Sequence, residues 1–291
     1  MNDRIIHVIG ASGRSGRSLC RALHARGYRV VPIVRDPARL PPDDRYAADA
    51  RVADVSGPAK VLVRALSDAR HIVNTAHARH TGAILNAAPP HATLIGLGST
   101  RKFTRWPDAH GTGVLAGEQA LMTSRRPGIM LHPTMIYGAT GEDNVQRLAR
   151  LLKFLPIVPL PQGGTALVQP IHQDDVTAAL IAAIDRATSG KLDAPGSMVI
   201  AGPQAMAYRD FVQGVAKAAG LGKRPILSLP AAALMAITPL AARLPGLPRI
   251  GRDEIRRLME DKAFDITPMR TVLGVDPRPL KDGLTQLFAR D

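Results

Sequence analysis

Short apolar runs alternate with amphipathic segments from the first residues of the chain onward. The apolar runs have the length and β-branched content of buried strands, and they lie at Arg4–Ile9, Arg29–Val34, Arg51–Val55, His71–Thr75, Ala92–Leu97 and Gly128–His132. Segments with helical spacing follow at residues 59–66, 83–87, 113–124 and 176–185. This alternation predicts an α/β fold built on a doubly wound parallel sheet of the Rossmann type.

The last third of the chain has a different pattern, which predicts a smaller C-terminal α+β lobe. Short strands are expected at residues 198–200 and 226–230 and a helix at residues 208–219, while the Pro- and Gly-rich segment Pro156–Gly164 is expected to be a loop. We therefore expect residues 1–195 to form the nucleotide-binding domain, with residues 139–165 contributing to the second lobe. Residues 196–291 would then form the small substrate or partner lobe.

The first strand leads directly into the glycine-rich turn Gly10-Ala11-Ser12-Gly13-Arg14-Ser15-Gly16, and a helical segment follows. Strand, glycine turn and helix together form the corner that cradles phosphates in dinucleotide-binding folds. In such a corner Gly10 permits the tight turn, Gly13 lets the backbone approach a pyrophosphate, and Gly16 lets the helix pack on the strand. The sequence therefore predicts a nicotinamide dinucleotide site at this turn.

The spacing Gly-x-x-Gly-x-x-Gly resembles that of the short-chain dehydrogenase/reductase superfamily, in its extended or atypical branch of NAD-dependent epimerase/dehydratase-like proteins. Two later segments extend the resemblance: Leu131–Gly138 is similar to the family's Leu-Arg-Pro-x-x-x-Tyr-Gly, with His132 in place of the arginine, and Gln169–Val176 is similar to Pro-Val-His-Val-x-Asp-Val. The latter is expected to introduce a helix capped by Asp174 or Asp175.

The pattern is closest to that of the NADPH-binding accessory subunit of respiratory complex I and its bacterial relatives. The shared features are an arginine after the second strand, Pro-Thr-Met-Ile-Tyr-Gly, and Gln-Pro-x-His before a late helix. In that group the nucleotide serves structure more than turnover.

The end of the second strand indicates which dinucleotide is preferred. NAD-dependent enzymes usually hold the ribose hydroxyls there with an acid, but this chain has Arg35, and the acid Asp36 comes one residue later. A guanidinium suits the 2′-phosphate of NADP(H), with Arg14 and Arg39 adding charge, so NADP(H) is favoured over NAD(H). The alternative is that these arginines are simply solvated.

The family resemblance implies further cofactor contacts along the crevice at the carboxyl ends of the strands. Together with the turn and the arginines, the predicted cofactor-binding residues are Gly10, Ser12, Gly13, Arg14, Ser15, Gly16, Arg35, Arg39, Asp54, Val55, Thr75, Ala76, His77, Pro133, Thr134 and Ile136.

The catalytic pair of the family, Tyr-x-x-x-Lys, is missing from this chain. No tyrosine lies between Tyr46 and Tyr137, and matching Glu118 to the family's glutamate puts His110 at the tyrosine position and Val114 at the lysine position. The hydroxyl residues survive as Ser99 and Thr100, so Ser99, Thr100 and His110 are the candidate catalytic residues.

Histidine carries protons near neutral pH, but His110 would need a cationic helper, which Lys102, Arg101 or Arg105 could supply. The alternative is that His110 is a polar loop histidine. His77, His80 and His132 are also candidates for the crevice, but their spacing is not that of a metal site, and no metal is expected.

The net charge of +14 is compatible with an anionic protein or a membrane surface as partner, besides the cofactor and an unknown small-molecule substrate. Aromatic residues make up only 3%, so base stacking and nucleic-acid binding are not expected. The single cysteine, Cys20, is expected in the core. No signal peptide is expected, so the protein is predicted to be cytoplasmic, with the alternative of a location at the membrane periphery.

The apolar segment Leu227–Leu247 is interrupted by Pro239 and Arg243. It suits either a buried helix pair or an apolar surface for a membrane, a lipid-like substrate or a partner.

Two functional hypotheses remain open. The first is an oxidoreductase or epimerase with a non-standard acid–base group, acting on an apolar or nucleotide-linked substrate. The second is a non-catalytic protein that holds its nucleotide for assembly or regulation. The missing Tyr-Lys pair favours the second hypothesis, whereas the Ser99/Thr100 crevice with its histidines favours the first.

Overall fold

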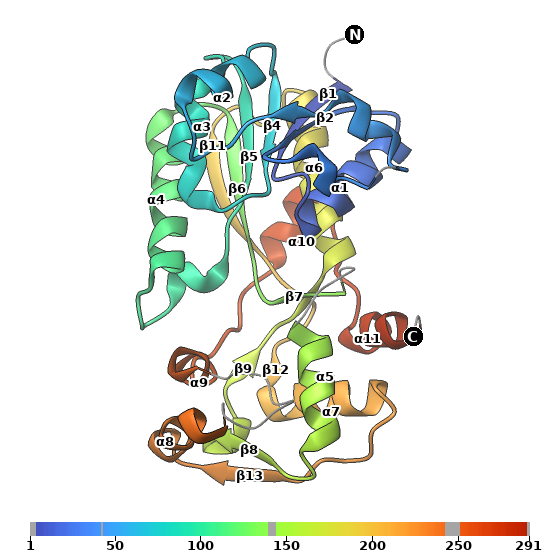
Figure 1. Cartoon of the computed structure of the whole chain (residues 1–291), viewed down its shortest axis with the longest axis vertical. Helices are drawn as coiled ribbons and strands as arrows, with labels where there is room; N and C mark the ends of the chain where they lie inside the picture. The colour runs from blue at the N-terminus through green and yellow to red at the C-terminus, as the bar shows by residue number, and fades with distance from the viewer. Residues whose placement is uncertain (1–3, 42, 139–143, 242–250, 290–291) are drawn as a thin grey trace.

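A parallel sheet of seven strands, in the order β11-β6-β5-β4-β1-β2-β3, forms the centre of the upper part of the molecule in Figure 1. The computed structural model describes residues 4–41, 43–138, 144–241 and 251–289. The strands are β1 (Ile5–Ile9), β2 (Arg29–Val34), β3 (Arg51–Val52), β4 (His71–Asn74), β5 (Thr93–Leu97), β6 (Gly128–Pro133) and β11 (Pro195–Ile200). The register places Val8, Val73, Ile95 and Ile129 in one row across the sheet. The predicted doubly wound α/β fold is confirmed.

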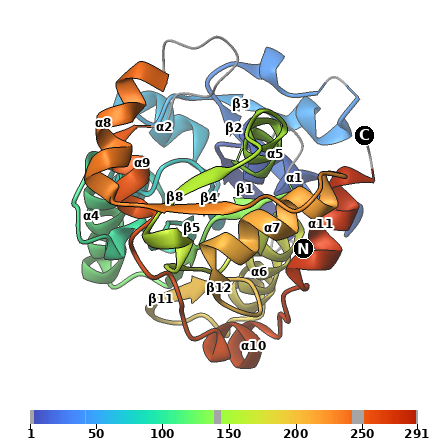
Figure 2. The ribbon, with the colours of Figure 1, turned by 90° about the horizontal axis from the view of Figure 1, so that it is seen from below.

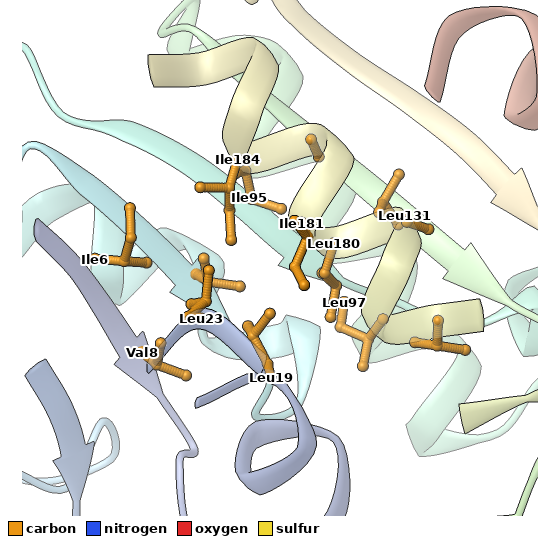
Figure 3. Close-up of a cluster of buried hydrophobic side chains, with 14 of the residues drawn as sticks. Ile6, Val8, Leu19, Leu23, Ile95, Leu97, Leu131, Leu180, Ile181 and Ile184 are labelled. Atoms are coloured by element: carbon orange, nitrogen blue, oxygen red, sulfur yellow. The ribbon is translucent and has the colours of Figure 1, made fainter. Parts of the chain in front are cut away.

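Helices cover both faces of the sheet, which explains why its strands are apolar throughout. On one face lie α1 (Arg14–Ala25), α6 (Gln173–Thr188) and α10 (Thr267–Leu273), and on the other lie α2 (Ala59–Ala65), α3 (Thr81–Ala87) and α4 (Ala109–Ser124). Figure 3 shows the first of these two cores, in which Leu19 and Leu23 of α1 approach Ile181 and Ile184 of α6 over the sheet. Each face therefore has its own hydrophobic core.

A second lobe lies beyond the carboxyl ends of the strands (Figure 1). Its core packs Tyr137, Leu152, Val215 and Phe211 together. The lobe contains β7 (Ile136–Tyr137), α5 (Asn144–Phe154), β8 (Val158–Pro161), β9 (Leu167–Val168), β10 (Ile171–His172), β12 (Met206–Ala207), α7 (Tyr208–Ala218), β13 (Ile226–Leu229), α8 (Ala231–Ala241), α9 (Arg252–Arg257) and α11 (Leu280–Phe288). Figure 2 shows α8 and α9 at one edge of this lobe and α11 at the opposite edge.

Two local predictions are wrong. The segment Pro156–Gly164 is not all loop, because Val158–Pro161 forms β8 and pairs in parallel with β13. Proline is tolerated there because each strand of a two-stranded sheet has a free edge. Helix α6 begins at Gln173 and not after Asp174 or Asp175, because His172 is its N-cap and accepts the Asp174 N–H at Nδ1, at 3.2 Å.

The division of the chain at residues 195 and 196 stays a prediction, but elements from beyond it lie on the sheet. Strand β11 pairs with β6 along its whole length, and α10 contributes Met269 and Leu273 to the core beneath α6. The chain therefore forms part of the second lobe between β6 and β11 before β11 completes the sheet.

Cys20 is fully buried in the sheet core, as predicted, and burial raises the pKa of its thiol. In the apolar segment Leu227–Leu247, β13 and α8 take up most of the described part, and residues 242–247 lie outside the described residues. Within the described ranges, no helix has the length and apolar character needed to cross a bilayer.

Candidate functional site

The glycine turn between β1 and α1 is tight and packs directly against the segment that follows β4. Gly10 has a φ of +79°, and a Cβ added there would lie 2.8 Å from the Ala76 nitrogen. A Cβ at Gly16 would lie 2.2 Å from the Gly10 carbonyl oxygen. Both positions therefore require glycine, and Thr75 strengthens the contact by donating its hydroxyl to the Ile9 carbonyl at 2.8 Å.

The start of α1 is open to an anion. Its N-cap is Gly13, so no side chain caps the first turn, and a Cβ at Gly13 would meet only the Gly10 oxygen, at 3.2 Å. Uncapped amide groups at a helix N-terminus attract phosphate. A hollow of about 1030 Å³ beside the turn is lined by Ser12, Gly13, Arg14 and Arg39, among others. The structure thus brings these four predicted residues together.

At the end of β2, the basic residue Arg35 is exposed and the acidic residue Asp36 is bound to the backbone. Arg35 is exposed, and its guanidinium makes no ion pair with any residue in the described ranges. Asp36 accepts the Ala38 N–H at 3.0 Å and so caps the short 3₁₀ helix Pro37–Arg39. Among the residues that the structure describes, Arg35 therefore has no ion pair that would keep it from a ligand.

The other predicted cofactor residues lie at the same edge of the sheet, but several of their polar groups already have partners. The Asp54 carboxylate accepts the Ser56 N–H at 2.9 Å, and the Ser15 hydroxyl donates to the side chain of Gln173 at 2.9 Å. Thr134 is buried and donates its hydroxyl to the Gln169 carbonyl. Val55 is half-buried, Pro133 is buried and Ile136 belongs to β7. Their cofactor contacts stay predictions.

His77 and His110 form a pair that the sequence did not predict. The His77 Nε2 lies 3.2 Å from the His110 Nδ1, and the two rings meet edge to face with centroids 4.4 Å apart. The Arg79 N–H donates to the His77 Nδ1 at 3.1 Å. Gly113 makes room for this pair, because a Cβ there would lie 2.9 Å from the His77 ring.

The electrostatic surroundings keep both histidines neutral. Burial, followed by the charge of His110 and of Arg79, lowers the pKa of His77 to about 4. Burial also lowers the pKa of His110, and the positive charge of Arg101 is the next largest cause of the lowering. Both imidazoles are therefore uncharged at neutral pH.

Ser99 and the start of α4 are tied together by an ion pair. Arg101 donates through Nε to Asp108 at 2.6 Å, and Asp108 caps α4 by accepting the Gly111 N–H at 2.8 Å. The Ser99 hydroxyl accepts the Arg101 N–H at 3.1 Å. Thr100 is buried and donates to the Pro133 carbonyl at 3.2 Å, so its hydroxyl is committed to the fold.

Lys102 is not available as a helper for His110. Its Nζ contacts both carboxylate oxygens of Glu118, at 2.7 and 2.6 Å, and its side chain is only 9% exposed. Burial raises the pKa of Glu118, but the hydrogen bonds from Lys102 and Ser197 outweigh it and leave the pKa lowered. Of the three cations considered as helpers, Arg101 is the one whose charge changes the pKa of His110, and it lowers that pKa.

His132 does not face the crevice. It is fully buried, and burial together with the charge of Lys102 lowers its pKa to about 4. The Ser99 N–H donates to its Nδ1 at 3.3 Å, and its Nε2 lies 3.1 Å from the Ser197 hydroxyl. His132 therefore supports Ser99 from behind, where the family has an arginine.

A cavity of about 740 Å³ lies between the sheet and the second lobe, beside Ser99 and Thr100. Its wall includes Glu260, which is buried and accepts the Thr104 hydroxyl at 2.8 Å and the Arg105 N–H at 2.6 Å. These two hydrogen bonds join segments more than 150 residues apart, and no local signal in the sequence could have indicated them. The cavity is the candidate substrate site.

Comparison with known proteins identifies the cofactor class. A family model described as NAD(P)H-binding matches residues 10–106. The chain is 30% identical over 224 residues to 3-diazoavenalumate denitrifying reductase from a Streptomyces species, over 64% of this chain and 73% of the relative. The glycine turn thus belongs to a domain that binds a nicotinamide dinucleotide.

Solved structures share the fold over nearly the whole chain. The NADPH-dependent quinone oxidoreductase QOR2 of Escherichia coli, complexed with NADPH, has a TM-score of 0.73 at 19% identity and covers 97% of this chain and 99% of its own. The UDP-glucuronic acid 4-epimerase of Bacillus cereus, in complex with UDP-glucuronic acid and NAD, has a TM-score of 0.69 at 18% identity and covers 98% of both chains. With the fold, the matched domain and the reductase relative in agreement, the chain belongs to the atypical short-chain dehydrogenase/reductase-like family of NAD(P)H-binding proteins.

Proposed function

We propose that this protein is an NADP(H)-dependent oxidoreductase in which His110 replaces the missing tyrosine. Bound NADPH would supply the hydride. The glycine turn would hold its pyrophosphate at the uncapped start of α1, and Arg35, with Arg14 and Arg39 nearby, would hold the 2′-phosphate. The occupied carboxylate of Asp36 supports NADP(H) over NAD(H).

The contact between His77 and His110 carries this proposal. Because the Arg79 N–H occupies the His77 Nδ1, the proton of neutral His77 lies on Nε2 and is donated to the His110 Nδ1. The proton of neutral His110 then lies on Nε2, which has no hydrogen-bond partner among the residues the structure describes and can donate. His110 would thus present a fixed N–H to a substrate oxygen that gains charge.

A neutral imidazole is a weaker acid than the tyrosine–lysine pair, so carbonyl reduction is expected to be slow. A positioned acid–base group contributes about 10²–10⁴-fold to rate. Because the pKa of His110 is lowered, its imidazolium forms only on the acid side of neutrality, and turnover should rise as the pH falls into that range.

The test is stopped-flow oxidation of bound NADPH against ketones, enones and sugar nucleotides. His110→Ala should abolish turnover and its acid-side rise while NADPH binding persists. His91→Ala, which changes an exposed histidine at the far end of the sheet, is the matched control. Undiminished turnover in His110→Ala would overturn the assignment.

A second candidate is a protein that holds its nucleotide for assembly, as the resemblance to the complex I accessory subunit suggests. The commitment of Lys102 to Glu118 and of Thr100 to Pro133 favours it, because neither group is left for chemistry. The net charge of +14 would suit an anionic partner. Slow NADPH release from a protein that reduces nothing in the panel would support this candidate over the first.

A further inference from the structure

The cavity between the sheet and the second lobe combines apolar walls with charged groups. Phe103 and Phe264 lie on it with ring centroids 5.5 Å apart, and Met135, Leu148 and Phe211 extend the apolar lining. Its volume of about 740 Å³ is in the range that encloses a small organic molecule.

The acidic residues of the lining all have partners within the protein. Glu254 pairs with Arg147 at 3.2 Å and accepts the Gly251 N–H at 2.8 Å. Glu260 accepts the Thr104 hydroxyl and the Arg105 N–H, and Asp261 accepts the Leu167 N–H at 2.8 Å. The carboxylates are thus largely occupied by donors of the chain itself.

Not every basic residue of the lining has an acidic partner among the described residues. Arg101 pairs with Asp108, and Lys262 donates its Nζ to the Arg257 carbonyl at 2.7 Å. The Arg257 guanidinium has no hydrogen bond or ion pair with any residue the structure describes. Arg105 is exposed and stacks over Trp106 at 5.6 Å from the ring centroid. Two guanidinium groups at the cavity therefore lack a carboxylate partner in the described ranges.

Arg257 also lies close enough to act on the proposed donor. Burial lowers the pKa of His110, and the positive charges of Arg101, Arg79 and Arg257 lower it further. Arg257 likewise lowers the pKa of Lys262, where burial is the main cause. An anion bound at Arg257 would therefore lie in the same electrostatic neighbourhood as His110.

We propose that the cavity binds a small substrate with an apolar body and one oxyanion group, a carboxylate or a phosphate, held by Arg257 with Arg105. The planar fork of a guanidinium matches both oxyanions, and the phenylalanines would cover the apolar body. The proposal rests on the proposed function and deepens it, because it names the substrate class of the cavity that Ser99 lines.

The test measures binding through Trp106, the single tryptophan of the chain, in protein loaded with NADP⁺. The probes are 3-phenylpropanoate, 2-phenylethyl phosphate and the neutral 3-phenylpropanamide. We expect the better of the two anions to bind about tenfold or more tightly than the amide, the scale of a charged hydrogen-bonding contact. Whichever anion binds more tightly identifies the oxyanion.

Arg257→Ala should remove the preference for the anions and leave amide binding unchanged. Arg256→Ala, the neighbouring exposed residue of α9 that pairs with Asp253, should keep it. If Arg257→Ala does not fold, added salt should weaken anion binding by the native protein and spare the amide. Equal binding of anions and amide by the native protein, or a preference that survives in Arg257→Ala, would overturn the proposal.

The outcome is separable from that of the proposed reductase. Anion preference in a protein that reduces nothing in the panel would refute the reductase and keep the binding site. Turnover of neutral substrates without anion preference would refute the site and keep the reductase.

Discussion

Replacing Arg35 by alanine tests the assignment of NADP(H) with little disturbance of the fold. The side chain is exposed at the end of β2 and makes no ion pair in the described ranges, so its removal leaves no buried group without a partner. Asp36 keeps its bond to the Ala38 N–H, and the short helix Pro37–Arg39 stays capped. Any change in cofactor affinity then reflects the lost guanidinium.

The size of the effect follows from the exposure of the site. A hydrogen bond to a charged group is worth about 1.5–3 kcal/mol, and solvent screening at an exposed arginine puts the value near the lower end. A loss of about 1.5–2 kcal/mol corresponds to roughly 10- to 30-fold weaker NADPH binding. NADH has no 2′-phosphate, so its affinity should hardly change.

The measurement is calorimetric titration of both cofactors into native protein, Arg35→Ala and Arg29→Ala. Arg29 lies at the opposite end of the same strand, where it pairs with Asp49 at 3.0 Å, and serves as the matched control. The advantage of NADPH over NADH should shrink at high salt in the native protein. Equal loss of both cofactors in Arg35→Ala, or no loss of NADPH, would show that the 2′-phosphate is held elsewhere.

Three further predictions concern the glycine turn and a buried histidine. Gly13→Val should abolish NADPH binding while the fold survives, because the added side chain would stand where the pyrophosphate approaches the backbone; NADPH binding by this variant would place the cofactor elsewhere. Gly16→Ala should instead destabilise the fold by on the order of 3 kcal/mol in urea unfolding, because its Cβ would lie 2.2 Å from the Gly10 oxygen. His132 is buried with a pKa of about 4, below its unfolded value, so its contribution to stability is present above pH 6.5 and lost as the pH falls toward 4. Between pH 7.5 and 5 the free energy of unfolding should drop by about 2 kcal/mol more in the native protein than in His132→Gln, and equal drops would contradict the shift.

The parts of the fold that the sequence predicted are those with local causes. Strands buried on both faces read as continuous apolar runs, and Gly10 and Gly16 are required by backbone approaches within one turn. Strand β8 was missed because Pro159 and Pro161 indicate a loop in isolation, and only the pairing with β13 makes them edge-strand residues.

The candidate site was predicted less completely, because its contacts join distant segments. The sequence placed His110 at the tyrosine position but gave no sign that the His77 ring, 33 residues earlier, would lie within 3.2 Å of its Nδ1. It also left Lys102 as a candidate helper of His110 and His132 as a crevice candidate, although Glu118 binds the first and Ser197 contacts the second inside the protein. Pairings of this kind depend on tertiary packing, for which periodicity carries no information.

The return of β11 to the sheet also determines how this protein can be divided and made. When only residues 1–194 have emerged from the ribosome, the β6 edge of the sheet, which carries Ile129 and Leu131, is still unpaired. Its partner strand β11, with Met198 and Ile200, has not yet emerged. Open apolar edges favour pairing between chains. The sheet is therefore expected to be completed only after the second-lobe elements that precede β11 have been synthesised, so a fragment that ends before Pro195 should not fold correctly on its own.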